Sequence, residues 1–312
     1  MSYLILDPIC DHNTGITTYS TLLHNLLLDY GLDAVLLSNK QNRPVREFYN
    51  YIQNEIDLSK HFVEIPETDC TYINKIERDN VRLHGNRKIL NDKQGISIGN
   101  DKFEDDLKRI LLSKIISSPS QQNAMEMREI LNTDKIIVYP NPIPEAKRPY
   151  RIERDIDFLF LGRYFKIKGI DFLPQFERRL NKKISVYSSN ISTVTSIIKG
   201  NRIKNNITKS EVYSRTKVVI IPSLYETFSM VKYEALSYGC NVVTWDTTPV
   251  NIKEKNLGVF VAKSFDVDQF VELATSAEKN FQYIDDQYDN YKKYSEDNNK
   301  LVISKIQEMM NE

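Results

Sequence analysis

The residues best suited to chemistry are two glutamates, Glu226 and Glu234, which stand on either side of the expected start of a helix. A buried strand is predicted just before them, over Lys217–Ile221, and the helix is predicted to begin near Ser229. The first amides of such a helix have no partner within it, so they favour an anion such as phosphate. These amides belong to Ser229, Met230 and Val231. The two carboxylates would then accept hydrogen bonds from hydroxyl groups on either side of the anion.

A second group of candidates, Arg163 and Lys168, follows the strand predicted over Asp157–Leu161. Gly162 and Gly169 flank this group and permit the tight loop that would bring the two cations together. Two fixed cations near a helix N-terminus suit a departing diphosphate, because negative charge develops on its oxygen. The spacing therefore predicts an anion site shared by two strand ends.

The N-terminal half offers two further candidates. Gly15 lies in the segment Asp11–Ile16, between an expected strand and an expected helix, and His84 follows the apolar residues Val81 and Leu83. A single glycine is a modest signal for a phosphate-binding loop. An isolated histidine is more often structural than functional.

The elements that must position these residues alternate between strand and helix in both halves of the chain, which predicts parallel sheets with crossover helices. In the N-terminal half, strands are expected at Tyr3–Leu6, Ala34–Leu37, Phe62–Ile65 and Ile136–Tyr139, and helices at Ile16–Leu27, Glu47–Ile56 and Phe103–Ile116. In the C-terminal half, the other strands are expected at Ile184–Tyr187, Val242–Trp245 and Gly258–Ala262, and the other helices at Ile170–Leu180, Lys209–Arg215, Val267–Lys279 and Lys300–Met310. The fold class is therefore α/β, with two doubly wound domains.

Composition excludes several classes of protein. The 312 residues carry 42 Lys+Arg and 42 Asp+Glu, and this zero net charge argues against general nucleic-acid binding. Cys10, Cys70 and Cys240 are far apart and form no pair typical of zinc or of a disulfide framework. With no signal peptide and no apolar run long enough to span a bilayer, a cytoplasmic protein is expected.

The segment Pro222–Gly239 resembles the signature of retaining glycosyltransferases with the GT-B fold, family four in the sequence classification, also called glycosyl transferases group 1. Phe158–Asp171 is similar to the family's strand, Gly-Arg and Lys-Gly segment. His84 is similar to its strand-end histidine, and Gly15 lies where the family has a Gly-rich loop. The sequence departs from the pattern at Ser229, where the family usually has glycine, and we expect serine to be accommodated there because it can cap a helix.

The resemblance implies two Rossmann-like domains that face each other across a cleft. Residues 1–145 would form an acceptor-binding domain and residues 146–290 a nucleotide-sugar-binding domain, with residues 291–312 forming a helix that packs back toward the first. The implied reaction moves a sugar from a nucleotide-diphosphate donor, a UDP-sugar first of all, to a hydroxyl of a glycan or lipid-linked glycan, with retention at the anomeric carbon. Bacterial surface polysaccharide synthesis is the implied role, with no metal or other cofactor.

The resemblance also implies a role for each candidate. Arg163, Lys168 and the three amides would stabilise the departing diphosphate, and Glu226 would orient the donor sugar. Glu234 would hold the ribose, and His84 would touch the sugar from the other domain. The catalytic residues would be Glu226, Arg163, Lys168 and His84, and the donor-binding residues Glu234, Ser229, Met230, Val231 and Gly15.

Two other functions stay open at this point, a catalytically idle GT-B subunit that supports a partner enzyme and a two-domain sugar-binding protein of the periplasmic type. The idle subunit is favoured by the loop at Gly15, which has a single glycine, and by the serine at position 229. A peripheral membrane contact also stays open, through Lys108, Arg109 and Lys114 on the helix expected over Phe103–Ile116. The alternative for these cations is an ordinary solvated helix face.

Overall fold

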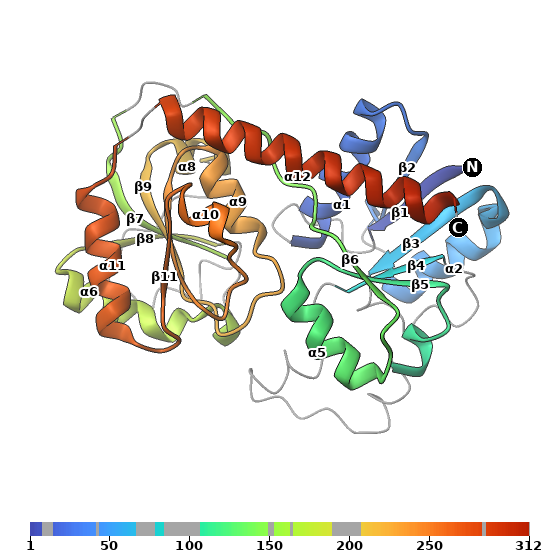
Figure 1. Ribbon diagram of the computed structural model, residues 1–312, viewed down its shortest axis with the longest axis horizontal. Helices are drawn as coiled ribbons and strands as arrows, with labels where there is room; N and C mark the ends of the chain where they lie inside the picture. The colour runs from blue at the N-terminus through green and yellow to red at the C-terminus, as the bar shows by residue number, and fades with distance from the viewer. Residues whose placement is uncertain are drawn as a thin grey trace. The chain divides into compact units, whose positions relative to one another are not determined.

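A computed structural model describes residues 1–7, 15–41, 44–66, 79–83, 107–148, 153–162, 165–188, 207–282 and 285–311. The chain forms two compact units, shown in Figure 1. Unit 1 comprises Met1–Pro142 and Asn298–Glu312, and unit 2 comprises Ile143–Asp297. In the part that is described, no helix combines the length and the apolar character needed to cross a bilayer. The predictions for His84 and Arg163 concern residues outside the described part.

Unit 1 is built on a parallel six-stranded sheet with the strand order β2-β1-β3-β4-β5-β6. Because β2 and β3 lie on opposite sides of β1, the sheet is doubly wound, as the sequence predicts. Its strands are β1 (Ser2–Asp7), β2 (Ala34–Ser38), β3 (His61–Pro66), β4 (Asn80–Arg82), β5 (Ile115–Ser118) and β6 (Ile136–Val138). Its described helices include α1 (Gly15–Asp29), α2 (Val45–Glu55), η1 (Leu58–Lys60), α5 (Gln121–Leu131) and the second half of α12 (Asp285–Asn311).

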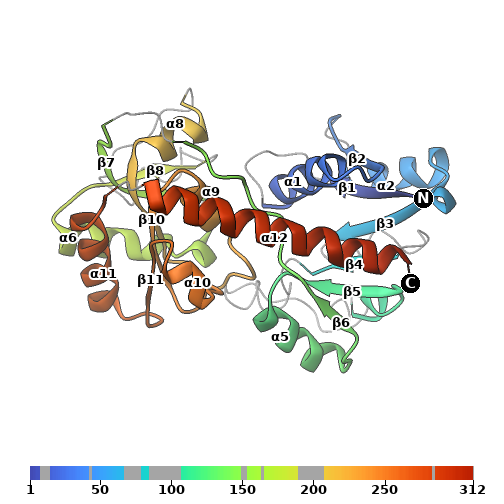
Figure 2. The same ribbon diagram turned by 45° about the horizontal axis from the view of Figure 1, so that its top comes forward.

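Helices cover both faces of the unit 1 sheet. Alternate residues of a strand face opposite layers, so Tyr3 and Ile5 pack with α1 and α12, whereas Leu4 and Leu6 pack with α2. Helix α5 packs on Val81 of β4 and on residues of β5 and β6, on the side of the sheet away from α1 (Figure 2). These apolar layers fix the sheet whose carboxyl edge carries the start of α1.

Unit 2 contains a second parallel sheet, with the strand order β11-β10-β9-β7-β8. Its strands are β7 (Ile156–Leu161), β8 (Ile184–Tyr187), β9 (Thr216–Ile221), β10 (Asn241–Trp245) and β11 (Val259–Ala262). Its described helices include η3 (Lys166–Lys168), η4 (Ile170–Phe172), α6 (Leu173–Leu180), α8 (Lys209–Ser214), α9 (Met230–Ser237), α10 (Ile252–Lys255), α11 (Val267–Lys279) and the first half of α12. This sheet is doubly wound about β7, because β8 and β9 pair with its opposite edges.

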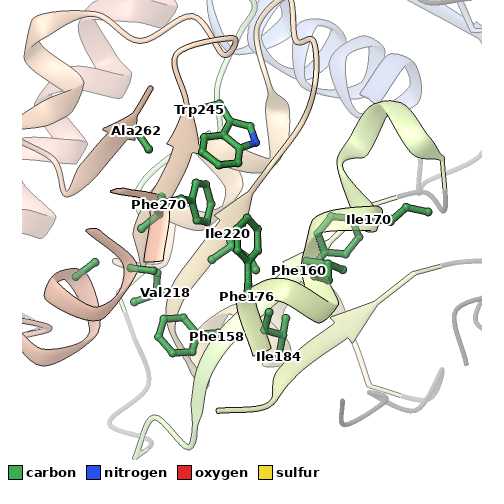
Figure 3. Packing of buried hydrophobic residues seen from close by; sticks show 14 of the residues in the cluster. Phe158, Phe160, Ile170, Phe176, Ile184, Val218, Ile220, Trp245, Ala262 and Phe270 are labelled. Atoms are coloured by element: carbon green, nitrogen blue, oxygen red, sulfur yellow. The ribbon is translucent and has the colours of Figure 1, made fainter. Parts of the chain in front are cut away.

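Aromatic side chains fill the layer between the unit 2 sheet and the helices α6 and α11 (Figure 3). Phe176 of α6 and Phe270 of α11 stack with ring centroids 4.5 Å apart, and Trp245 of β10 lies 4.4 Å from Phe270. All three side chains are buried. Each such ring removes a large apolar area from water, so this face forms a firm base for the loops at the strand ends.

Three predicted helices differ from those observed. The helix predicted over Phe103–Ile116 is wrong in its second half, because Ile115–Ser118 forms β5 between β4 and β6, and sheet pairing prevails over the helical spacing. The helix predicted over Ile170–Leu180 is split into η4 and α6, with a proline at the start of α6. The final helix begins at Asp285 and not at Lys300, since its polar first half buries Tyr291.

Candidate active site

Lys168 and Glu226 meet at the carboxyl ends of β7 and β9, which are neighbouring strands of the unit 2 sheet. The Lys168 Nζ atom lies 2.6 Å from Glu226 Oε1, and the side chains are 27% and 12% exposed. Since β8 follows β7 on one side and β9 lies on the other, this place is the topological switch point, where ligands bind in open α/β sheets. The structure thus brings together two of the residues that the sequence singled out.

Backbone contacts hold the two loops against each other. The Leu224 amide donates to the Ile167 carbonyl at 2.8 Å. Gly169 has a φ of +72°, and a Cβ atom on it would stand 1.8 Å from the Pro222 carbonyl oxygen, so only glycine fits. This close approach explains why the lysine is followed by a glycine.

The Glu226 carboxylate is oriented by two donors on the same oxygen. Its Oε1 atom accepts from Lys168 and also from the Ser223 hydroxyl, which lies 2.8 Å away. No described residue is bonded to the Oε2 atom of Glu226. A half-buried carboxylate with one oxygen held and one available is suited to bind a hydroxyl group.

Ser229 lies immediately before α9 in a left-handed backbone conformation, with φ +66° and ψ +82°. The expectation that its side chain caps the helix is wrong, because no capping hydrogen bond is made. Its hydroxyl oxygen is buried and has no hydrogen-bond partner among the residues that the structure describes. The positive φ supplies a physical reason for the glycine that the resembling family carries here, because glycine adopts this conformation without strain.

The start of α9 offers the amides that the sequence predicts. Lys232 is the first residue of this segment whose amide is bonded inside the helix, to the Ser229 carbonyl at 3.1 Å. The amides of Met230 and Val231 precede it in the first turn, where helical amides lack intrahelical acceptors. They stand at the same carboxyl edge of the sheet as Lys168 and Glu226, so positive charge and free donors gather there.

Glu234 lies further along α9 and is 13% exposed. Its Oε2 atom accepts a hydrogen bond of 2.8 Å from the Tyr213 hydroxyl, and its Oε1 atom lies 3.6 Å from Lys209 Nζ. Both partners belong to α8. Glu234 is thus a held carboxylate and not a freely solvated one.

A second lysine of α9, Lys232, is fully buried with Glu254. The two form an ion pair of 2.7 Å, and Lys232 also donates to the Pro249 carbonyl at 2.6 Å. The Glu254 carboxylate accepts further bonds from Tyr233 and Tyr294, at 2.6 and 2.8 Å. Burial lowers the pKa of Lys232, while the charge of Glu254 opposes that change. This pair fastens α9 to α10 and to the loop that follows β10.

The remaining predicted site residues are placed as follows. Gly15 begins α1 in unit 1, after residues 8–14, which lie outside the described part. His84 and Arg163 also lie outside it, although Leu83 and Gly162 directly before them are described. No group of three or more metal-binding side chains occurs among the residues that the structure describes.

The partners of the two glutamates are not evident from the sequence. Lys209 and Tyr213 lie four residues apart on a predicted helix, which places them on one face. That spacing was the available signal, but nothing in the sequence connects this face with Glu234. Ser223 could have been found from its position beside the strand end.

Part of the chain matches a known protein family, and the whole chain shares its fold with solved structures. Residues 202–298 match the model of the family described as Glycosyl transferases group 1. A sucrose-phosphate synthase from Thermosynechococcus elongatus has a similar structure, with a TM-score of 0.77 over 99% of both chains at 12% identity. Residues 202–298 therefore match a glycosyltransferase family, and the chain has the GT-B fold.

Two further solved structures share the fold of this chain. A trehalose-6-phosphate structure from E. coli bound with UDP-2-fluoro glucose has a TM-score of 0.66 at 10% identity, over 99% of both chains. WaaG, a glycosyltransferase involved in lipopolysaccharide biosynthesis, has a TM-score of 0.62 at 13% identity, over 95% of both chains. No curated protein matches the chain by sequence.

Proposed function

We propose that this protein transfers a sugar from a nucleotide-diphosphate donor, a UDP-sugar, to a hydroxyl of a glycan or lipid-linked glycan with retention at the anomeric carbon. Unit 2 binds the donor and unit 1 binds the acceptor. The observation that carries the proposal is the Lys168–Glu226 pair at the switch point of unit 2, beside the first amides of α9. The biological role is bacterial surface polysaccharide synthesis.

The chemistry follows from what these groups can stabilise. The bond between the anomeric carbon and the diphosphate oxygen breaks, and the acceptor oxygen bonds to that carbon on the same face. The acceptor proton passes to the departing phosphate, so the products are a glycoside and a nucleoside diphosphate. Lys168, Arg163 and the amides of Met230 and Val231 stabilise the charge that develops on the leaving oxygen.

Lys168 can serve the diphosphate without releasing Glu226, because an ammonium group has three N–H donors. One of these donors is used by Glu226. Because the Lys168 side chain is 27% exposed, a ligand can reach the ammonium group. Glu226 then orients the donor sugar through the oxygen that Lys168 and Ser223 leave available.

We propose that no metal takes part, because the two cations and the helix amides supply the positive charge that a metal would bring. Turnover should then persist in excess EDTA. A loss of activity in EDTA that added Mg²⁺ or Mn²⁺ restores would contradict this proposal.

Two structural neighbours support the choice of ligands. One is bound with UDP-2-fluoro glucose, which is a nucleotide-sugar. Another is a glycosyltransferase involved in lipopolysaccharide biosynthesis. Both share the fold of this chain over nearly its whole length, so a UDP-sugar and a glycan acceptor are the first ligands to test.

A donor screen tests the proposal. The purified protein is incubated with UDP-, GDP- and ADP-sugars, and release of the nucleoside diphosphate is measured. We expect release from a UDP-sugar, and in the presence of an acceptor a product with the anomeric configuration of the donor. Release from none of the donors, or an inverted product, would contradict the proposal.

Substitution of each glutamate should affect a different step, nucleotide binding for Glu234 and turnover for Glu226. Glu234→Gln should weaken UDP binding more than it slows turnover, because the ribose is held alike in the ground and transition states. Glu226→Gln should chiefly slow turnover, since it orients the reacting sugar. Equal affinity of the wild type and Glu234→Gln for free UDP would refute the ribose role.

A peripheral contact with anionic lipid is the second part of the proposal. Leu111 and Leu112 are 47% and 75% exposed in the turn before β5, with Lys108 and Arg109 just before them and Lys114 just after. Apolar side chains beside cations suit an anionic surface, although Lys114 is paired with Asp79 at 2.6 Å. Co-sedimentation with anionic vesicles should fall when both leucines are changed to serine, and unchanged sedimentation would contradict the contact.

A further inference from the structure

Two residues of α8 hold the Glu234 carboxylate by its two oxygens. The Tyr213 hydroxyl donates to Oε2 at 2.8 Å, and Lys209 Nζ lies 3.6 Å from Oε1. Lys209 and Tyr213 are four residues apart, so they share one face of the short helix. A carboxylate restrained at both oxygens cannot rotate freely about its last bond.

Tyr213 is itself held firmly. It is buried, and its ring stacks on Tyr238 with centroids 5.6 Å apart and planes 16° apart. Its carbonyl accepts from the thiol of Cys240, 3.2 Å away. Burial and the charge of Glu234 raise the pKa of Tyr213 well above its usual value, so the hydroxyl stays protonated and always donates.

Restraint of this kind leaves a defined binding geometry. An ionised carboxylate has about four lone-pair positions, and the two partners from α8 occupy one on each oxygen. Each oxygen therefore keeps capacity for one more donor, and part of the group is open to solvent. Two oxygens held in this way match two neighbouring hydroxyl groups, such as the 2′ and 3′ hydroxyls of a ribose.

We propose that Tyr213 and Lys209 are positioning residues, which fix the orientation in which the Glu234 carboxylate meets the ribose hydroxyls of the donor. The inference rests on the proposed role of Glu234 in donor binding. It adds the two residues that set the orientation of this carboxylate.

Calorimetric titration with UDP and with 2′-deoxy-UDP tests the inference in the full-length protein. Wild type should bind UDP about fivefold or more tightly than 2′-deoxy-UDP, as expected when one hydrogen bond to a charged group is lost. Tyr213→Phe keeps the ring and its stacking. It should lower the affinity for UDP about fivefold and change that for 2′-deoxy-UDP less. The ratio of the two affinities should therefore fall toward one.

Two further variants complete the test. Lys209→Gln, at a half-exposed position where folding is not at risk, should reduce the preference for UDP about twofold. Tyr238→Phe is the matched control, because it removes a hydroxyl from the ring stacked on Tyr213 and none that bonds to Glu234. It should retain both wild-type affinities.

The outcomes separate this inference from the proposed function. If Tyr213→Phe and Lys209→Gln keep the wild-type preference, or lower both affinities equally, the two residues have a structural role only and the inference is overturned. If wild type binds both nucleotides equally well, Glu234 does not hold the ribose and the inference falls with that role. If wild type binds neither nucleotide, the proposed donor itself is wrong.

Discussion

The buried polar cluster of unit 1 and the polar edge of the unit 2 sheet each contain a glutamate held by hydrogen-bond donors, yet the two differ in their access to solvent. In unit 1, Glu64 accepts from Tyr19 at one oxygen and from Tyr3 and Asn80 at the other, at 2.6, 2.6 and 2.7 Å. In unit 2, Glu226 has one oxygen held by a lysine and a serine, and its side chain is 12% exposed.

Arg82 completes the unit 1 cluster. It is fully buried, donates to Asn141 and to the Tyr139 carbonyl at 2.8 Å, and lies 3.8 Å from the centre of the Tyr139 ring. Glu64 is only 2% exposed. The apolar layer beneath α1 and α12 covers one side of this part of the sheet.

The difference separates polar groups that stabilise a fold from polar groups that can bind a ligand. A buried charge whose capacity is used by fixed partners contributes to stability and cannot exchange those partners for a substrate. A partly exposed charge contributes less to stability, because water screens it, and it can accept a new partner at smaller cost. Helix α9 shows both kinds, since Lys232 is buried with Glu254 whereas Glu234 is partly open.

The largest effect on stability should come from unit 1. Arg82→Met leaves the buried Glu64 charge without its neighbouring cation and should lower the free energy of unfolding by about 3 kcal/mol. Urea denaturation measures this loss. Arg128→Met is the control, because Arg128 is half-exposed and makes one described hydrogen bond, to the Ile136 carbonyl, and it should cost less than about 1 kcal/mol. Equal losses in both variants would remove the distinction between the two regions.

The largest effect on catalysis should come from unit 2. Lys168→Ala should lower turnover about a hundredfold or more, the scale expected when one preorganised charge stabiliser is lost. Its stability should fall less than that of Arg82→Met, since both side chains are partly exposed and Glu226 keeps the Ser223 hydroxyl as a partner. Lys166→Ala, two residues earlier and exposed, is the matched control and should keep wild-type turnover. Near-normal turnover of Lys168→Ala would sink the assignment of the site.

A smaller effect is expected at Ser229, and it has the opposite sign. Ser229→Gly removes both a left-handed serine and a buried hydroxyl without a described partner, so it should raise the free energy of unfolding by about 1 kcal/mol. Asn181→Gly is the control, because Asn181 has a φ of +50° at the end of α6, and asparagine tolerates that conformation better. Its gain should be smaller. A stability loss in Ser229→Gly would show that the hydroxyl has a partner that matters.

Much of the fold follows from the sequence, because apolar runs and turns mark strands of parallel sheets well. β8 and α11 have the bounds that were predicted. Two of the failures share a cause, which is that tertiary packing decides the structure where local signals conflict. Ile115 and Ile116 have helical spacing but pair as a strand, and the polar start of α12 is helical because tyrosines on it are buried.

The candidate site was predicted in part. The spacing of Glu226, Ser229 and Glu234 identified the start of α9, and Gly169 marked the loop that carries Lys168. The ion pair between Lys168 and Glu226 was not foreseen, because it joins two loops whose approach depends on Gly169 packing against Pro222. The support of Glu234 by α8 was also missed, since only the packing of α8 on α9 shows it.

A structure of the protein crystallised with UDP tests the central claim most directly, because it shows where a nucleotide diphosphate binds. The account predicts the diphosphate at the start of α9, within hydrogen-bond distance of Lys168 Nζ and of the amides of Met230 and Val231, with the ribose hydroxyls on Glu234. Diphosphate density elsewhere on the molecule, with the Lys168–Glu226 pair unchanged, would contradict it.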